Sequence, residues 1–371
     1  MKIGILTVPF NNNYGGFLQA FALKTVLVQM GHEVLFINRK RNKPKGLKSA
    51  IKCLLIKFRL RKDYHTEKIK ELSIHTNEFK EKYLEPITEE YYSTKDLKKC
   101  LKHGIDCFIV GSDQVWRYQY ARASITDFYF SFLKKTKIKR LSYAASFGID
   151  ELDYPIQLKN ECRLLLNDFC AISVREKSST NILKNEFKIH PDKISFVLDP
   201  TLLLEPSIYI SLFDNNFQKT QQRYLFTYIL DNDNDKVEFI NEVQAYLKIG
   251  KLALRAQTGD ITQLTPIAYV EEWLSKIYYA DFVITDSFHG AVFSIIFNKP
   301  FLIYGNPERG ITRFASLLSI FELENRYIDN KKQFSSSILR DGIKWETINK
   351  KLKTLQEESI SFLYNNLKTY Q

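Results

Sequence analysis

The chain has 371 residues, 44% of them hydrophobic, which predicts a globular protein of about two domains and excludes a mainly disordered or fibrous one. Its net charge of +12 favours an anionic partner such as phosphate, nucleic acid or an acidic membrane face. The alternative is a genome composition that favours lysine. No apolar run reaches the roughly 20 residues of a membrane span.

The cysteines indicate a reducing compartment. There are five, an odd number without a CxxC pair: Cys53, Cys100, Cys107, Cys162 and Cys170. This pattern favours free thiols over a disulfide framework, and none has a partner at metal-ligand spacing. The first apolar run ends in Pro and Asn and reads as a strand, not a signal peptide. We therefore expect a cytoplasmic protein with no metal site.

Short apolar runs alternate with helical patterns along the chain. Strands are predicted at residues 2–8, 33–38, 106–111, 140–145, 171–175 and 194–199, and then at 224–230, 252–256, 281–285 and 301–305. Such alternation is typical of parallel sheets covered by helices. We predict an α/β fold of two Rossmann-like domains, 1–203 and 204–345, that share a central cleft. A C-terminal helical segment, 346–371, is predicted to fold as a helix pair.

A basic segment at about residues 39–70 interrupts the first domain. It has no acidic residue from 39 to 62, and its apolar residues fall at helical spacing: Leu47, Ile51, Leu54, Leu55 and Phe58. One interpretation is a basic amphipathic helix on an anionic membrane surface. The other is a solvated helix whose apolar stripe packs on the domain. The aliphatic stripe fits lipid better than nucleic acid, which would need exposed aromatic residues.

The stretch NNNYGG follows the first predicted strand and opens a long helical pattern. Gly15 and Gly16 let the backbone turn tightly and approach a ligand, and the N–H groups of a helix start suit an anion. Asn13 and Tyr14 belong to the same candidate site. The stretch is not GxGxxG, and Asn38 instead of an acid ends the second strand, so no dinucleotide site is predicted. The alternative is a tight turn with an Asn cap.

Two charged residues stand at predicted strand ends in the first domain. Asp113 is placed either to accept a hydrogen bond from a sugar hydroxyl or to cap a helix. Arg175 is placed either to grip a carboxylate or phosphate with two parallel hydrogen bonds, or to form a salt bridge to Glu176 or a neighbouring acid.

The stretch ITDSFHGAVFSIIF carries the chain's most informative histidine. Asp286 and Ser287 end a predicted strand, and His289 falls in the first turn of the next helix. It is either an acid at a cleft or a packed residue at a helix start. As an acid it would need a nearby anion, such as Asp286 or bound phosphate, because a helix N-terminus disfavours the imidazolium. Arg309 and Arg313 follow the next strand, so the strand ends indicate a pocket for a small, multiply charged anion.

Taken together and in order, six motifs resemble the polysaccharide pyruvyl transferase family from residue 13 to about 326. They are NYGGFLQAFAL, FIVGSDQVW, SYAASFG, SVREKSS, VLDPTLLL and VITDSFHGAVFSIIFNKPF. The resemblance implies a two-domain GT-B architecture with its active site in the cleft. It implies that Arg175 binds phosphoenolpyruvate and that His289 is the acid. A further basic residue, a lysine in some members, has no clear counterpart, so Arg313 or Arg309 is expected to replace it.

The implied reaction transfers the pyruvyl group of phosphoenolpyruvate to two hydroxyls of a sugar and forms a cyclic ketal. The implied setting is the synthesis of capsule, exopolysaccharide or cell-wall glycan. The expected partners are phosphoenolpyruvate, a polyprenyl-diphosphate-linked saccharide and an anionic membrane surface, with no cofactor and no nucleic acid. The enzyme would be cytoplasmic, or peripheral on the inner membrane face. The alternative is a GT-B glycosyltransferase with a nucleotide-sugar donor, for which no acidic residue is convincingly placed to bind a ribose.

Overall fold

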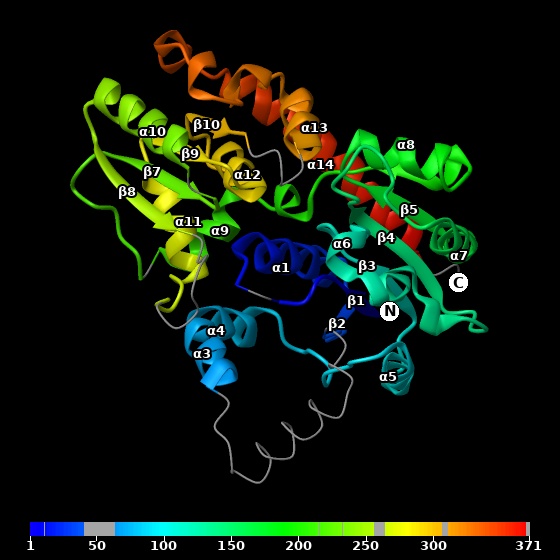
Figure 1. The fold of residues 1–371 in the computed structure, drawn as a ribbon. Helices are drawn as coiled ribbons and strands as arrows, with labels where there is room; N and C mark the ends of the chain where they lie inside the picture. Colours follow the sequence, from blue (N-terminus) through cyan, green and yellow to red (C-terminus); the bar gives the residue numbers. More distant parts are fainter. Residues whose placement is uncertain are drawn as a thin grey trace.

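The computed structural model describes residues 1–10, 12–40, 64–214, 216–231, 233–255, 264–305 and 311–368. It has two parallel β-sheets, each covered by helices on both faces (Figure 1). The fold class predicted from the sequence is confirmed. Most of the predicted basic segment, residues 41–63, lies outside the described residues, as does Arg309.

The first sheet has the strand order β2-β1-β3-β4-β5-β6, and the second has the order β11-β10-β9-β7-β8. The strands of the first sheet are β1 (Lys2–Leu6), β2 (Glu33–Phe36), β3 (Cys107–Val110), β4 (Lys139–Ala145), β5 (Ala171–Val174) and β6 (Ile194–Phe196). Those of the second are β7 (Tyr224–Ile229), β8 (Gly250–Arg255), β9 (Phe282–Thr285), β10 (Phe301–Tyr304) and β11 (Tyr327–Ile328). Each of the ten predicted strands is present. The sequence did not predict β11, whose two residues are too short to show a period.

Helices connect the strands. They are α1 (Tyr14–Gln29), α3 (Tyr64–Leu72), α4 (Ile74–Tyr83), α5 (Thr94–Leu97), α6 (Tyr118–Ala121), α7 (Ile156–Asn167), α8 (Lys177–Asn185), α9 (Pro206–Phe213), α10 (Asn234–Leu247), α11 (Val270–Tyr279), α12 (Phe288–Ile296), α13 (Ile311–Phe321) and α14 (Trp345–Leu367). Within the described ranges, no helix combines the length and apolar character of a membrane span.

Both sheets change direction at an inner strand. The chain runs from β1 outward to β2 and then returns to β3 on the other side of β1; the second sheet repeats this order at β7, β8 and β9. In open parallel sheets, ligands bind outside the carboxyl ends of the strands at this reversal point. We therefore expect a site shared by the two sheets to form where their reversal points face each other.

Hydrophobic packing joins the two sheets. One buried cluster extends from the first sheet to the second and includes Leu18 of α1, Trp273 of α11 and Phe293 of α12. Alternate residues of the strands build a separate cluster on the other face of each sheet. Helix α1 lies between the sheets, so its first ten residues are all buried. This explains why its sequence is apolar on every side.

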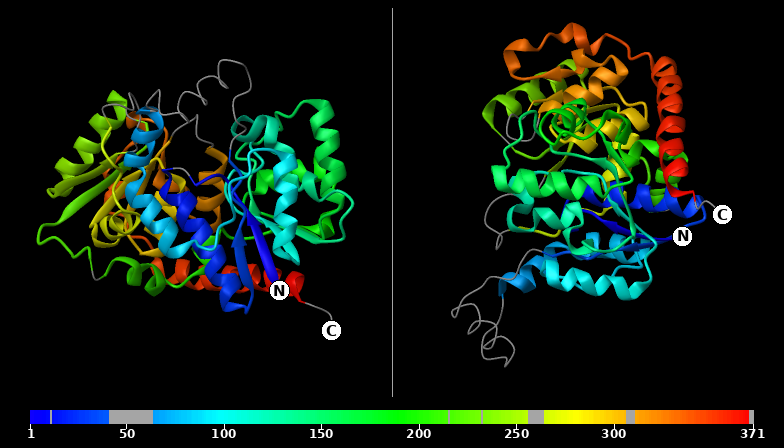
Figure 2. Two further views of the ribbon diagram at one scale, coloured as in Figure 1. Left: turned by 90° about the horizontal axis from the view of Figure 1, so that it is seen from below. Right: turned by 90° about the vertical axis from the view of Figure 1, so that its right-hand side faces the viewer.

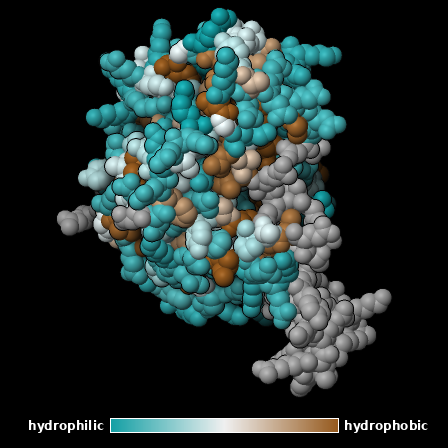
Figure 3. All heavy atoms as spheres, turned by 90° about the vertical axis from the view of Figure 1, so that its left-hand side faces the viewer, coloured by the Kyte–Doolittle hydropathy of each residue, from teal (hydrophilic) through white to brown (hydrophobic). Residues whose placement is uncertain are grey.

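The surface on the side of the second sheet is mostly hydrophilic, with apolar residues in scattered patches (Figure 3). Exposed apolar side chains on α10, such as Val237 and Tyr246, are isolated examples of the apolar atoms that any folded surface retains.

The closing helix α14 is one continuous helix of 23 residues, so the predicted helix pair was wrong. It begins beside the second sheet, where Lys351 pairs with Glu322 at 3.1 Å. It ends against the first sheet, where Phe362 packs on Tyr143 with ring centroids 6.3 Å apart. Figure 2 shows α14 running along both halves of the molecule. The helix therefore contacts both halves of the molecule and links the two sheets.

A buried hydroxyl links α14 to the first sheet and gives a first prediction. Ser359 accepts a hydrogen bond from the backbone N–H of Leu198 at 3.0 Å. We expect Ser359→Ala to lower the free energy of unfolding by about 1–3 kcal/mol, because that N–H would stay buried without an acceptor. Thermal melts followed by circular dichroism would show the lower Tm. Thr354→Ala is the control, since its exposed hydroxyl bonds only within α14. Equal Tm values for Ser359→Ala and the wild type would contradict the assigned role.

Candidate functional site

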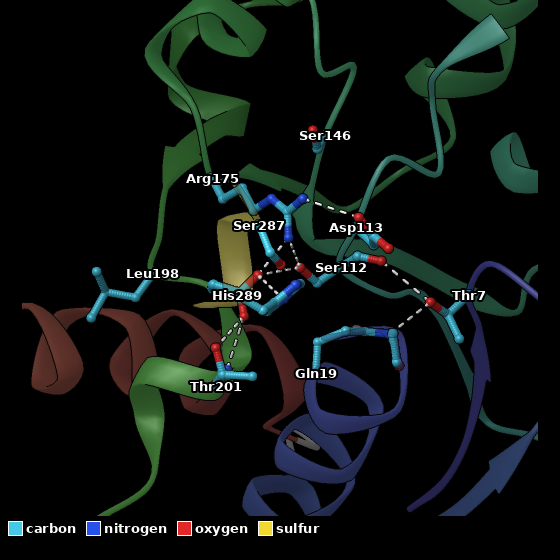
Figure 4. Close-up of polar contacts among 12 residues, drawn as sticks. Thr7, Gln19, Ser112, Asp113, Ser146, Arg175, Leu198, Thr201, Ser287 and His289 are labelled. Atoms are coloured by element: carbon cyan, nitrogen blue, oxygen red, sulfur yellow. Dashed lines mark hydrogen bonds and ion pairs between the residues drawn. The ribbon is translucent and has the colours of Figure 1, made fainter. Parts of the chain in front are cut away.

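A cavity of about 330 Å³ lies where the carboxyl ends of the two sheets meet. Seven predicted site residues line it: Asn13, Gly16, Asp113, Asp286, Ser287, His289 and Arg313. Three others, Tyr14, Gly15 and Arg175, are not among its lining residues. In Figure 4 the side chains of Arg175, Ser287 and His289 converge from different sheets.

His289 lies in the first turn of α12, as the sequence predicted. Ser287 is the N-cap of this helix, and its hydroxyl accepts from the N–H of Gly290 at 3.4 Å. A side chain at Gly290 would meet the Thr285 hydroxyl at 2.4 Å, and that hydroxyl already donates to the carbonyl of Tyr228. The SFHG sequence therefore lets α12 start directly against β9, which places His289 at the strand end.

The side chain of His289 is 7% exposed, and the residue lines the cavity. Its Nε2 lies 3.7 Å from Oδ2 of Asp199 and has no hydrogen-bond partner within the described part of the chain. The nearest anion is thus Asp199 and not Asp286, which the sequence had suggested. Asp199 follows β6 in the VLDPTLLL motif, where its position at a strand end before a proline was the available signal.

Asp199 joins His289 to Arg175. Its Oδ2 accepts from Arg175 Nη1 at 2.5 Å and from the Ser112 hydroxyl at 3.1 Å. Its Oδ1 accepts from the backbone N–H and the hydroxyl of Thr201, at 3.0 and 2.6 Å. Burial alone would raise the pKa of Asp199, but His289 and Arg175 outweigh it and hold the pKa well below its usual range. The carboxylate therefore stays charged at every physiological pH.

Arg175 is 4% exposed, and its guanidinium donates hydrogen bonds to neighbouring protein side chains. Besides its bond to Asp199, Nη2 donates to Asp113 Oδ1 and Nε donates to Glu176 Oε1, both at 3.2 Å. Burial would lower the pKa of Arg175, but Asp199, Glu176 and Asp113 raise it overall. The observed arrangement is thus the salt-bridged alternative. A direct grip on a ligand would require some of these bonds to be released.

Asp113 does not cap a helix but faces Arg175 from the loop after β3. Its backbone φ of +78° is unusual for a residue other than glycine, although Asp tolerates this region. Burial would raise the pKa of Asp113, but Arg175, His289 and Arg313 hold it below the ordinary value. Asp113 lines the cavity and also accepts a hydrogen bond from Arg175 of the buried network.

Arg313 supplies a second guanidinium, from α13 of the second sheet. It is buried and lines the cavity, with Cζ 5.4 Å from the ring centroid of Phe288. Arg175 Cζ lies 4.7 Å from the same ring. Burial first, and then Arg175, lowers the pKa of Arg313 below the ordinary value. A bound anion would offset both effects.

Two other predicted residues, Asp286 and Tyr14, make hydrogen bonds that hold parts of the fold together. The carboxylate of Asp286 accepts from the backbone N–H groups of Leu230 and Asp231, at 2.7 and 3.3 Å, and from Lys236 Nζ at 3.1 Å. It therefore ties β9 to the loop after β7. The hydroxyl of Tyr14 donates to the carbonyl of Ala268 at 3.0 Å, which joins α1 to the second sheet.

Gly15 has a different role from the tight turn that the sequence suggested. Gly15 and Gly16 lie in the first turn of α1, and the Asn13 side chain makes no capping hydrogen bond. A Cβ at Gly15 would lie 1.9 Å from Nδ1 of His289. The missing side chain is thus the space that the imidazole occupies. Gly16 has ordinary room for a Cβ, which would lie 3.6 Å from Asn13.

Two parallel sheets with a cavity at their facing carboxyl ends define a protein of the GT-B fold type. Solved structures share this fold. The UDP-GlcNAc 2-epimerase from Neisseria meningitidis bound to UDP-GlcNAc aligns with 99% of each chain, at 11% identity and a TM-score of 0.54. The S. aureus MnaA–UDP co-structure covers 100% of this chain and 99% of its own, at 14% identity and a TM-score of 0.55. At such identities the likeness shows the fold alone.

The sequence matches the family of polysaccharide pyruvyl transferases over residues 13–308, and the chain belongs to this family. The resemblance stated from the motifs is confirmed. Membership implies a pyruvyl donor and a glycan acceptor. A search of curated proteins finds no match. Within the described ranges, no three His, Cys, Asp or Glu side chains are grouped as candidate metal ligands.

The buried carboxylate gives a prediction for stability. We expect Asp199→Asn to lower the free energy of unfolding by about 3–5 kcal/mol at pH 7, because Arg175 would remain buried with less compensating charge. The contribution of Asp199 is present above the unfolded pKa of about 4 and is lost as the pH falls through the depressed folded pKa.

The deficit of Asp199→Asn relative to the wild type should therefore be full at pH 7 and shrink below about pH 4, as measured by denaturant titration at several pH values. Asp192→Asn is the control, since Asp192 is exposed and should change the free energy by no more than about 0.5 kcal/mol. A deficit that does not depend on pH would mean that the charge of Asp199 is unimportant.

The contact between Gly15 and His289 predicts coupled effects on stability. Gly15→Ala should destabilise the wild type, because the new methyl group forces the imidazole out of its position. In a His289→Ala background the same change should be neutral or stabilising, since alanine favours helix. Thermal melts of the four proteins give the coupling free energy, expected at about 0.5–3 kcal/mol. Additive effects would show that the two residues do not touch.

Proposed function

We propose that this pyruvyl transferase uses phosphoenolpyruvate as its donor and forms a cyclic ketal on two hydroxyls of a glycan sugar. The observation that carries the proposal is the position of His289. Its imidazole lies on the wall of the cavity, beside the buried carboxylate of Asp199, and Arg313 lines the same cavity. An acid and a cation are thus available in the same cavity.

His289 donates a proton to the methylene carbon of phosphoenolpyruvate, and carbon 2 becomes electrophilic. One sugar hydroxyl attacks carbon 2, the bond from carbon 2 to the phosphate oxygen breaks, and the second hydroxyl attacks the same carbon. Two carbon–oxygen bonds form and one breaks. Of the two protons that the hydroxyls release, one restores His289 and the other leaves on the phosphate.

The two arginines have different roles in this proposal. Arg313, on the cavity wall, holds an anionic group of the donor and so fixes its orientation. Arg175 acts through Asp199, because its own nitrogen atoms are bonded to protein acceptors. It is therefore a positioning residue in this proposal, in place of the direct contact that the family resemblance implied.

The acceptor in this proposal is a polyprenyl-diphosphate-linked saccharide at the cytoplasmic face of the membrane. The product enters capsule, exopolysaccharide or cell-wall glycan. The net charge of +12 suits an approach to anionic lipid. Peripheral attachment through the basic segment stays a prediction, because residues 41–63 lie outside the described residues.

The reaction is tested with phosphoenolpyruvate and a panel of galactosides, mannosaminides and glucosaminides. The assay follows acceptor-dependent phosphate release, and NMR of the product identifies the ketal carbon. His289→Ala should lower kcat by about 10²–10⁴, the usual contribution of a positioned acid. His190→Ala is the control, since His190 is an exposed residue outside the cavity lining.

Full turnover by His289→Ala would remove it as the acid. Consumption of a nucleotide sugar without phosphate release from phosphoenolpyruvate would favour the glycosyltransferase alternative instead.

A further inference from the structure

Part of the cavity lining has no role in the proposed handling of the donor. It comes from the loop that follows β1, at residues 8–10, and from residues between 114 and 128 that follow β3. His289 and Arg313 line the same cavity from the second sheet. A reaction that joins two substrates needs a second binding surface beside the first. These segments, called here the first-sheet wall, are the candidate for that surface.

Tyr120 presents an open aromatic ring on the first-sheet wall. It belongs to α6, is 51% exposed and lines the cavity. Its neighbour Tyr118 instead packs on Tyr154, with ring centroids 5.7 Å apart. Burial and Arg175 lower the pKa of Arg313, and Tyr120 is among the groups that oppose them, so the ring lies near that guanidinium. An open aromatic ring beside a polar pocket suits the apolar face of a sugar ring.

Gln114 adds a polar side chain to the first-sheet wall. The residue is 8% exposed and lines the cavity. Its side-chain amide makes no hydrogen bond with any described residue, and neither amide atom is among the polar atoms that are sealed from solvent without a partner. A buried residue whose polar group stays accessible and unpaired indicates a ligand that completes its hydrogen bonds. An amide both donates and accepts, as a sugar hydroxyl does.

The backbone holds Gln114 in this position. The N–H of Ser146 donates to the carbonyl of Asp113, and the N–H of Trp116 donates to the carbonyl of Ser146, both at 3.1 Å. Gln114 lies between these two connections. A Cβ at Gly148, where φ is +67°, would lie 2.1 Å from Oε1 of Gln114. The glycine therefore provides both the backbone turn and the space for the amide.

The charges of the first-sheet wall favour a neutral ligand. Its two cations, Arg39 and Lys40, are ion-paired with Asp127 at 2.8 Å and with Glu90 at 3.6 Å. Asp113 adds a carboxylate beside them in the cavity. A diphosphate would therefore gain little from these cations and would be repelled by Asp113. The hydroxyls of a neutral sugar can instead donate to this carboxylate.

We propose that Tyr120, Gln114 and Asp113 form the subsite for the acceptor sugar. The proposal rests on the proposed function, which requires a glycan beside the donor. The ring of Tyr120 stacks on the apolar face of the sugar, and Gln114 and Asp113 bind its hydroxyls. The sugar is thereby held next to the donor, with Arg313 close by. Gln114 selects for a hydroxyl at the position it contacts, since its amide would otherwise lose a partner.

The variants Tyr120→Ala and Gln114→Met test the subsite by kinetics. Both should keep the Tm of the wild type, because the ring of Tyr120 is half exposed and the amide of Gln114 bonds to no described residue. Each should raise the KM for the acceptor about tenfold, while the KM for phosphoenolpyruvate changes less than about twofold. Tyr246→Ala is the matched control, since Tyr246 is an exposed tyrosine of α10 outside the cavity lining and should change neither constant.

Sugar binding is also measured without the reaction, by saturation-transfer NMR with the methyl glycosides of galactose, N-acetylmannosamine and N-acetylglucosamine. At least one glycoside should bind the wild type, and its signal should be lost in Tyr120→Ala. Deoxy analogues of that glycoside then locate the hydroxyl that Gln114 contacts. The analogue that the wild type binds weakly should bind Gln114→Met as well as the parent sugar does, because methionine cannot bond to the hydroxyl.

The outcomes separate the subsite from the reaction. Failure of all three glycosides to bind the wild type, or equal binding by Tyr120→Ala, would overturn the subsite. Binding of uridine diphosphate that depends on Tyr120 would assign the wall to a nucleotide and overturn it as well. Glycoside binding that depends on Tyr120, without turnover of phosphoenolpyruvate, would support the subsite and contradict the reaction. Turnover with an unchanged acceptor KM in both variants would contradict the subsite alone.

Discussion

The carboxylate of Asp199 is the interaction on which the rest of the site depends. It is buried and bonded to Arg175 of the first sheet, and it lies 3.7 Å from His289 of the second. A buried charge is costly unless opposite charges and hydrogen-bond donors surround it. Arg175, Ser112 and Thr201, all in the first half of the chain, donate the hydrogen bonds that Asp199 accepts, and His289 adds an ion-pair contact from the second sheet. The charge network therefore extends across both sheets.

The network also explains how one cavity can receive an anion. The carboxylates of Asp113 and Asp286 reach the cavity wall, but each is already bonded to a cation. Arg313 stands on the same wall, with its positive charge disfavoured by burial and by Arg175. An anionic ligand would offset both effects, so the electrostatics of the cavity wall favour one.

Two glycines provide the space that the contacts around His289 require. Gly290 lets α12 approach Thr285 of β9, and Gly15 leaves the space that the ring of His289 fills. In neither residue does φ reach the left-handed region, so the requirement is for space rather than for backbone freedom. Each glycine belongs to a different sheet's reversal point. The two reversal points thus pack closely against each other.

Much of the fold could be predicted from the sequence, because each strand is a short apolar run between helical patterns. The ten longer strands and the start of α12 were found in this way. The position of His289 at a strand end followed from the same local signals. The two-residue strand β11 and the single helix α14 were missed. The first has no period to detect, and the continuity of the second depends on packing along both sheets.

The sequence alone determined which residues stand at the carboxyl ends of strands, since periodicity and turn residues are local properties. It therefore singled out Arg175, His289 and Arg313. The partners of these residues depend on which strand ends meet across the cleft, and only the tertiary structure decided that. Asp199 became the anion beside His289, and Arg175 became a bonded framework residue. These contacts join positions far apart in the chain, and no local pattern encodes them.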